Sequence, residues 1–321
     1  MCSSDLAAGE LHARRHGRLR RWREALHQDT RRGALLPALL TCAAAPFALA
    51  GLAARLLAPA RAARLRRAFD LPVPTRIDFV AANDSPPASP EAPRLGFTDA
   101  EQAERVQALL RSTGLTRGFA QWVAIVGHAS RNQNNPHASA YNCGACAGRF
   151  SGPNARLVAA MANRREVRAL LAQRGIEIPE GTRFVGAEHD TCSDSFAWYD
   201  LEDVPASLRP ALDKLRAALD AAARAHAQER CRRFASAAPG IQAQAAQRHV
   251  ADRASDFSQA RPELGHVTNA CAFFGRRAMS RGAFFDRRAF LISYDPAQDP
   301  DGTVLERHLL TNGAVGAGIS L

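Results

Sequence analysis

The sequence contains a single lysine, Lys214, although it carries a net charge of +11. Arginine supplies almost all of the positive charge, and alanine is abundant. Because this composition is typical of coding bias in a GC-rich bacterial genome, arginine enrichment alone is poor evidence for phosphate recognition. Residues 1–70 hold thirteen arginines and five acidic residues, a net charge of +8. The basic character is therefore a property of the N-terminal segment and not of the whole fold.

No secretory signal is visible, because the first apolar stretch follows a long arginine-rich segment. The cysteines are odd in number and irregular in spacing, which does not indicate a disulfide framework. A reducing cytoplasm with free or metal-bound thiols fits them better. The seven cysteines are Cys2, Cys42, Cys143, Cys146, Cys192, Cys231 and Cys271.

Residues 1–6 (M-C-S-S-D-L) have the character of an adapter-derived, non-native start, so we expect the natural chain to continue upstream of residue 7. Residues 7–82 are predicted to form a basic and apolar helical segment. Within it, residues 33–54 carry no charge and are long enough to span a bilayer, with arginines on both sides. Pro46 lies in the middle of this run, where it should break a continuous helix. The pattern therefore favours a helical hairpin over a membrane span.

The basic N-terminal helices have no aromatic interleaving and no recognised nucleic-acid motif, so we expect no nucleic-acid partner. Anionic lipid or an acidic protein surface fits the adjacent apolar run better. A proline-rich connection follows over residues 83–97.

Residues 98–321 are predicted to form an α/β domain with a mostly parallel sheet flanked by helices, incomplete at its C-terminal end. Thr98 and Glu101 form a capping box at the start of its first helix. The predicted elements are a helix over 98–112, a strand over 119–127, a loop over 128–152, a helix over 153–174, a strand ending at His189, a helix over 206–234 and a strand ending at Tyr294.

The loop over 128–152 places two histidines and two cysteines close together in sequence, directly after an apolar strand. In open α/β sheets, ligands are usually held at this end of a strand, and thiolates with imidazoles are preferred zinc ligands. A CxxC pair such as Cys143 and Cys146 is also found in redox dithiols and in glycine-rich turns. The redox interpretation needs the first cysteine at a helix N-terminus, whereas here the helix is expected only at Pro153.

The phrase G-H-A-S-x-N-Q-N-N-P-H-A-S-A and the following C-G-A-C-x-G resemble the DabA family of inorganic-carbon transporter subunits. Further blocks continue the resemblance in the same order, including G-P-N-A-R, R-G-I-x-I-P, D-F-S-Q-x-R-P-E, R-A-F-L-x-S-Y-D and Q-D-P-D. Together they cover about residues 98–321, whereas the N-terminal 97 residues resemble the family only in character.

The resemblance implies one Zn²⁺ ion in a site similar to that of β-carbonic anhydrases. Its metal ligands in this sequence would be His128 and Cys143, with Cys146 as a neighbouring, non-ligating cysteine. The family's other two ligands, a Cys and an Asp, come from an upstream C-x-D-x-R motif that this sequence lacks. The expected catalytic Asp/Arg dyad therefore lies upstream. Cys192-Ser193-Asp194 imitates C-x-D but has Phe196 at the arginine position, and we interpret it as a decoy.

Several neighbours of the predicted site have ordinary structural interpretations. His137 is expected to be a hydrogen-bonding loop residue and His189 a mainly structural residue at a strand end. Arg131 and Arg156 are expected to be surface arginines that could attract an anionic product. The asparagines of this region are expected to tie the loop down through side-chain to main-chain hydrogen bonds. These asparagines are Asn134, Asn135 and Asn154.

The resemblance also implies what the protein does. It predicts a subunit that hydrates CO2 to bicarbonate while bound to the membrane subunit DabB, a relative of proton-pumping dehydrogenase subunits. The expected location is the cytoplasmic side of the bacterial inner membrane, as a peripheral protein. Two alternatives remain: a zinc-stabilised binding module without turnover, and a thiol redox protein that uses Cys143 and Cys146.

Overall fold

The computed structural model describes most of the chain from residue 97 onward and parts of the N-terminal segment. The described residues are 17, 18, 21, 24, 25, 28, 35–59, 61, 62, 65, 77, 97–132, 149–256, 258, 259, 269–286 and 288–320. The chain divides into two compact units. The first is Met1–Asp78 with Ser255–Ser258, and the second is Phe79–Ala254 with Gln259–Leu321.

The first unit contains one long apolar helix, α2 (Leu35–Leu57), which runs without interruption through Pro46. The predicted hairpin is therefore wrong. A proline removes one main-chain hydrogen bond, but alanine and leucine on both sides favour the helix strongly enough to carry it past that position. Pro37–Leu57 is long and apolar enough to cross a membrane, with a mean hydropathy of 1.7, and none of it is buried. The predicted basic helices before and after α2 fall largely outside the described residues.

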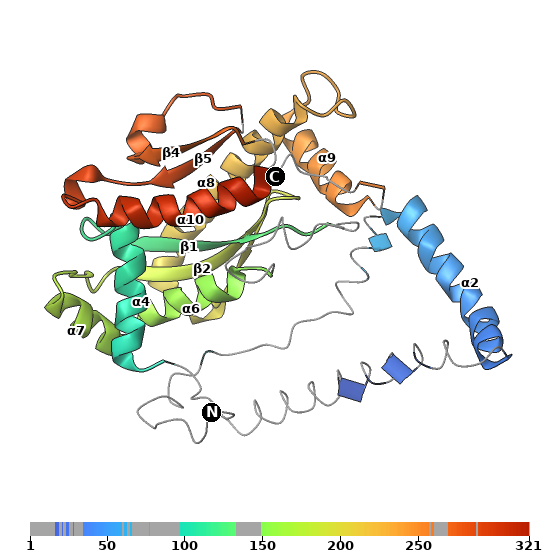
Figure 1. The fold of residues 1–321 in the computed structure, drawn as a ribbon, viewed down its shortest axis with the longest axis horizontal. Helices are drawn as coiled ribbons and strands as arrows, with labels where there is room; N and C mark the ends of the chain where they lie inside the picture. Colours follow the sequence, from blue (N-terminus) through green and yellow to red (C-terminus); the bar gives the residue numbers. More distant parts are fainter. Residues whose placement is uncertain are drawn as a thin grey trace. The chain divides into compact units, whose positions relative to one another are not determined.

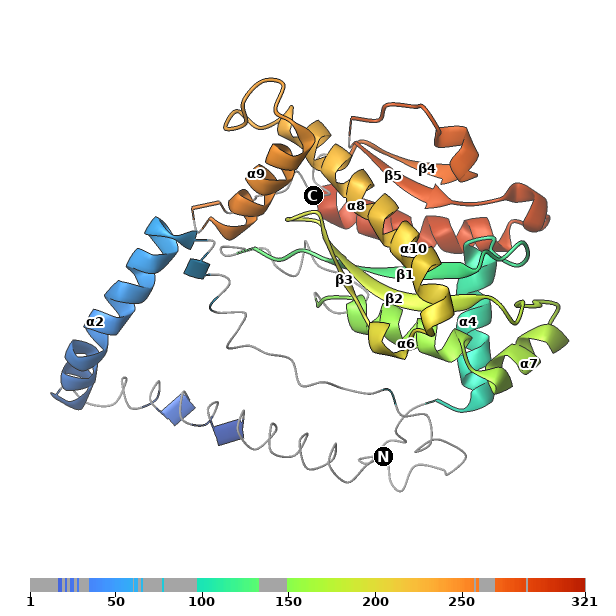
Figure 2. The ribbon, with the colours of Figure 1, turned by 180° about the vertical axis from the view of Figure 1, so that it is seen from behind.

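The second unit is built on a three-stranded sheet in the order β1-β2-β3. Figure 1 labels β1 and β2, and Figure 2 adds the label of β3. Strands β1 (Trp122–Ala129) and β2 (Arg183–Asp190) are parallel, and β3 (Ser195–Trp198) is antiparallel to β2. The α/β class is confirmed, but this sheet is mixed. The short connection from β2 to β3 allows only an antiparallel hairpin.

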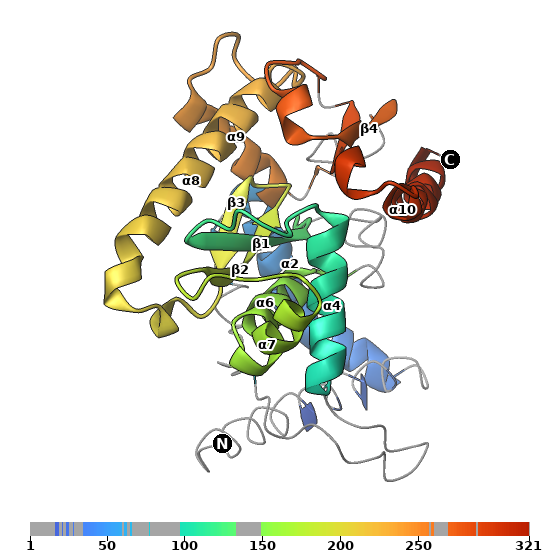
Figure 3. The same cartoon turned by 90° about the vertical axis from the view of Figure 1, so that its left-hand side faces the viewer.

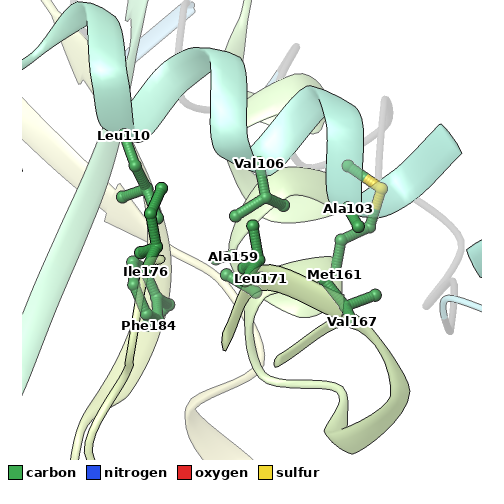
Figure 4. Close-up of a cluster of buried hydrophobic side chains, with 10 residues drawn as sticks. Ala103, Val106, Leu110, Ala159, Met161, Val167, Leu171, Ile176 and Phe184 are labelled. Carbon is green, nitrogen blue, oxygen red and sulfur yellow. The ribbon is translucent and has the colours of Figure 1, made fainter. Parts of the chain in front are cut away.

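One face of the sheet is covered by three helices, α4 (Asp99–Ser112), α6 (Gly152–Ala162) and α7 (Arg165–Gln173). Their apolar side chains meet those of the strands in the largest hydrophobic cluster (Figure 4). The capping box of α4 is present as predicted: the Glu101 amide donates to Thr98 Oγ1, and the Thr98 amide donates to Glu101 Oε2. The helix therefore begins where the sequence placed its first turn.

The opposite face of the sheet is covered by α8 (Arg209–Cys231), as Figure 3 shows. A second cluster there joins Val185 of β2 to Val204 and Leu212. Helix α9 (Ala243–Ser255), which the sequence analysis did not predict, packs against the end of α8 through a third cluster around Ala227 and Val250. Figure 2 views α8 and α9 from behind.

The predicted strand near Tyr294 exists as β5 (Ala289–Ser293), but it lies outside the three-stranded sheet. It pairs in parallel with β4 (Cys271–Gly275) in a separate sheet of two strands. Helix α10 (Thr303–Ser320) follows. The short 3-10 helices of the unit are η2 (Leu201–Asp203), η3 (Ala206–Leu208), η5 (Arg277–Ser280) and η6 (Pro296–Gln298).

The single helix predicted over 153–174 is in fact two helices, separated at Asn163 and Arg164. Asn163 directs its side-chain amide to the main chain of Phe184 in β2, donating to the carbonyl at 2.8 Å and accepting from the amide at 2.9 Å. This pair of hydrogen bonds ties the helix end to the sheet. Arg164 then adopts an extended conformation before α7 begins. A contact between distant segments therefore set the break.

Candidate functional site

His128 is the next-to-last residue of β1, so the strand extends two residues beyond its predicted end at Gly127. The strand is extended because its parallel pairing with β2 continues to Ala129, and within this pairing His128 lies in register with His189. Partners in register point to the same face of a sheet, which is here the face that α8 covers. The His128 ring is half-buried at the carboxyl edge of the sheet.

Ser151, which directly precedes α6, holds the main chain of His128 by hydrogen bonds. Its amide donates to the His128 carbonyl at 2.9 Å, and its hydroxyl exchanges hydrogen bonds with both main-chain groups of His128. Helix α6 begins one residue later and approaches β1 very closely. A Cβ atom on Gly127 would lie 2.6 Å from the Ser151 carbonyl carbon. Glycine at this position therefore allows the contact that holds His128 in place.

Glu188 is a buried carboxylate beneath the same edge, on the α6 face of the sheet. It accepts a hydrogen bond from the Gly152 amide at 3.1 Å and forms an ion pair with Arg131. The pKa of the neighbouring Tyr199 is raised by its burial and by the charge of Glu188. Arg131 also lies over the Phe150 ring, at 4.0 Å from its centroid. Arg131 is partly exposed, as expected of a surface arginine, but its guanidinium is also paired with Glu188.

Arg156, the other arginine expected at the surface, is mostly buried. It forms a two-point ion pair with Asp200, with Nε 2.8 Å from Oδ2. Hydrogen bonding to Asp200 raises the pKa of Arg156 despite the opposing effect of burial. Its guanidinium is therefore part of the fold.

Asp194 is engaged by three basic side chains. Its Oδ1 lies 3.2 Å from His189 Nε2 and 3.0 Å from His226 Nδ1, and its Oδ2 accepts from Arg230 at 3.0 Å. Burial alone would raise the pKa of Asp194, but the two histidine hydrogen bonds and the charge of Arg230 hold it well below its usual range. Cys192, two residues earlier, is fully buried, with Sγ 3.1 Å from Ser130 Oγ.

Of the other residues predicted around the site, Asn154 lies on α6 and is exposed, and the remaining five cannot be placed. Cys143, Cys146, His137, Asn134 and Asn135 lie outside the described residues. Within the described ranges, no three His, Cys, Asp or Glu side chains form a group that could hold a metal ion. The structure therefore places one of the two predicted ligands, His128, and leaves its pairing with Cys143 a prediction.

Glu188, Asp190 and Arg230 were not among the residues predicted to lie at the site. Glu188 and Asp190 carried a signal, because they end a buried strand at the same sheet edge as His128. Arg230 carried none, since it lies far along the chain on an arginine-rich helix.

The sequence profile described as "Probable inorganic carbon transporter subunit DabA" matches residues 3–321. The chain belongs to the DabA family. The match includes the N-terminal 97 residues and begins inside the segment 1–6 that we expected to be non-native. DabA membership thus extends well beyond the motif blocks at 98–321.

Individual DabA relatives agree with this assignment. The proteins so named from Methylococcus capsulatus and Dechloromonas aromatica are each 54% identical to 98% of this chain. The DabA 2 protein of Rhodopirellula baltica is 40% identical over 99% of it. The chain spans about a third of the length of these relatives, 30% of the first and 32% of the second. No solved structure matches the chain.

Proposed function

We propose that this chain is part of a subunit of an energy-coupled inorganic-carbon transporter, and that it contributes ligands to a zinc site where CO2 is hydrated. Family membership over residues 3–321 carries this proposal, because relatives bear the name of an inorganic-carbon transporter subunit. The proposed membrane partner is DabB, and the proposed location is the cytoplasmic face of the inner membrane. Helix α2 is compatible with an apolar contact there.

The donor chemistry supports zinc as the metal. His128 offers a half-buried imidazole at the carboxyl edge of the sheet, and Cys143 would add a thiolate from the following loop. Cys192 and Asp194 are poor candidates for the remaining ligands, because the Asp194 carboxylate is already held by Arg230 and two histidines. The family resemblance implies that those ligands come from a C-x-D-x-R motif, which these 321 residues lack. When bound, zinc would lower the pKa of water enough to supply a nucleophile for CO2 near neutral pH.

The residues of this chain would orient that chemistry. Ser151 fixes the main chain of His128, so the imidazole starts from a rigid strand end and not from a mobile loop. The Arg131–Glu188 ion pair leaves no free guanidinium charge from Arg131 beside His128. Arg156 is similarly paired with Asp200. Both Arg131 and Arg156 thus form ion pairs that support the fold.

The test is zinc content and inorganic-carbon uptake in cells that express DabB and the protein carrying this chain. His128→Ala and Cys143→Ala should each abolish zinc-dependent uptake, because each removes a metal ligand. Cys146→Ala is the matched control and should be far milder. Equal damage from Cys146→Ala and Cys143→Ala would show that the ligand assignment within C-G-A-C is wrong.

The same experiment separates the alternatives. A zinc-stabilised binding module would keep its metal but support no uptake with DabB present. A thiol redox protein would contain no zinc and would depend on both cysteines. Full uptake by both His128→Ala and Cys143→Ala would refute the zinc mechanism for this protein.

A further inference from the structure

The turn that follows β2, residues Thr191–Asp194, contacts the segment that follows His128. We call it the β2–β3 turn. The Thr191 amide donates to the Ala129 carbonyl at 2.9 Å, and the Thr191 hydroxyl donates to the same oxygen at 3.2 Å. The Arg131 amide donates to Asp190 Oδ1 at 2.9 Å, at the base of this turn. These hydrogen bonds continue the pairing of β1 and β2 beyond the ends of the strands.

Side chains extend the same contact. The buried Cys192 Sγ lies 3.1 Å from Ser130 Oγ and 3.7 Å from Asn132 Nδ2. Ser130 is itself buried. Every residue from Ala129 to Asn132 is therefore bonded, through main chain or side chain, to the β2–β3 turn or to Asp190 at its base.

One side chain from α8 fixes the shape of the β2–β3 turn. Arg230 Nη1 donates to the Thr191 carbonyl at 2.6 Å and to Asp194 Oδ2 at 3.0 Å, and its Nη2 donates to the Cys192 carbonyl at 2.7 Å. Both Arg230 and Asp194 have no exposed surface. Asp194 adopts a left-handed conformation, with φ of 51°, which the surrounding bonds maintain.

We propose that Arg230 is a positioning residue for the metal-binding loop. By holding three acceptors of the β2–β3 turn, it fixes Ala129–Asn132, the first residues of the chain that leads from His128 to Cys143. The effect of Arg230 on zinc binding rests on the proposed function, whereas its effect on the conformation of Ala129–Asn132 does not. Groups that orient metal ligands without touching the metal commonly affect its affinity. Lysine cannot replace Arg230, because it lacks the planar fork that reaches several acceptors at once.

The first test measures, without metal, whether Arg230 restrains residues 129–132. Hydrogen–deuterium exchange would be followed by mass spectrometry over residues 129–132 in the metal-free protein that carries this chain. Arg230→Lys should speed exchange there by about tenfold or more, as expected for losing hydrogen bonds to a charged group. Arg233→Lys is the matched control, because among the described residues Arg233 donates to the carbonyl and carboxylate of the partly exposed Asp286 and not to the β2–β3 turn. Unchanged exchange in a folded Arg230→Lys variant would overturn the proposal.

The second test measures the metal site. The zinc dissociation constant of Arg230→Lys should rise by about 10- to 100-fold, while that of Arg233→Lys stays at the parent value. The visible absorption bands of the Co²⁺-substituted protein should shift in the first variant only, which a loss of global stability would not cause. If Arg230→Lys fails to fold, Asp190→Ala removes the acceptor of the Arg131 amide, together with that of the Cys192 amide and the Ser193 hydroxyl, and leaves the acceptors of Arg230 in place. The same changes are then expected.

The outcomes separate this inference from the proposed function. If the parent binds no zinc, or if His128→Ala retains it, the proposed function fails and the exchange experiment alone decides whether Arg230 holds the loop. If exchange accelerates but zinc affinity and the Co²⁺ spectrum stay at parent values, the positioning role is refuted. Parent-like exchange and zinc affinity in Asp190→Ala would also count against it.

Discussion

At the scale of single residues, close packing between α6 and β2 depends on Gly186. A Cβ atom there would lie 2.6 Å from the Arg156 Cα, a main-chain atom that cannot move aside. Gly186→Ala should therefore lower the free energy of unfolding by about 1–3 kcal/mol through overpacking. Gly181→Ala is the control, because no atom lies within 4 Å of its Cβ position and its φ is not left-handed. Thermal or urea unfolding measures both, and equal midpoints would contradict the close-approach argument.

Asp194 gives a second prediction at this scale. Asp194→Asn should cost about 3–5 kcal/mol of stability at neutral pH, because it leaves the Arg230 charge buried without a counter-ion. The pKa of Asp194 is lowered in the folded state, so its contribution is present above its ordinary value of 3.8 and is lost as pH falls towards the folded value. The difference between parent and variant should thus be large above about pH 4 and shrink below it.

Urea unfolding at a series of pH values checks this dependence. Asp213→Asn is the control on α8, the helix that carries Arg230, because the Asp213 side chain is 66% exposed and its ion pair with Arg216 spans one helical turn. Its effect should stay within about 0.5 kcal/mol at every pH. A penalty for Asp194→Asn that grows on acidification would refute the assignment of Asp194 as an ionised partner of Arg230.

At the scale of elements, the first turn of α4 depends on its reciprocal cap. Thr98→Ala removes the acceptor for the Glu101 amide and should destabilise the helix by about 1 kcal/mol. Glu101→Gln should have a much smaller effect, since glutamine can still accept from the Thr98 amide. Exchange rates of the amides at 99–102 report the loss locally. Similar rates in Thr98→Ala and the parent would show that packing alone holds this helix end.

At the scale of the whole molecule, α2 raises the question of how the protein meets the membrane. Its apolar stretch is long enough to span, yet we propose a peripheral protein bound through DabB. An alkaline carbonate wash should then release the protein from membranes, while DabB stays in the pellet. Deleting DabB should leave the protein in the soluble fraction. Retention after the wash in cells without DabB would show that α2 inserts into the bilayer.

The sequence by itself determined the features that depend on short stretches of chain. The reciprocal cap at Thr98 and Glu101, the two apolar strands before His128 and Asp190, and the ordered motif blocks were all readable locally. They were enough to place His128 at the carboxyl edge of a sheet and to indicate the family. Such features are set by neighbours along the chain, whose spacing is fixed by covalent geometry.

Only the tertiary structure decided what distant segments do to one another. Asn163 ends α6 because its side chain bonds to Phe184, and β5 pairs with β4 outside the main sheet. Above all, Asp194 forms a buried ion pair with Arg230, 36 residues later in the chain. Both residues are ordinary in sequence. Their buried pairing arises only when α8 packs on the sheet, because a guanidinium taken out of water must find its acceptors within reach.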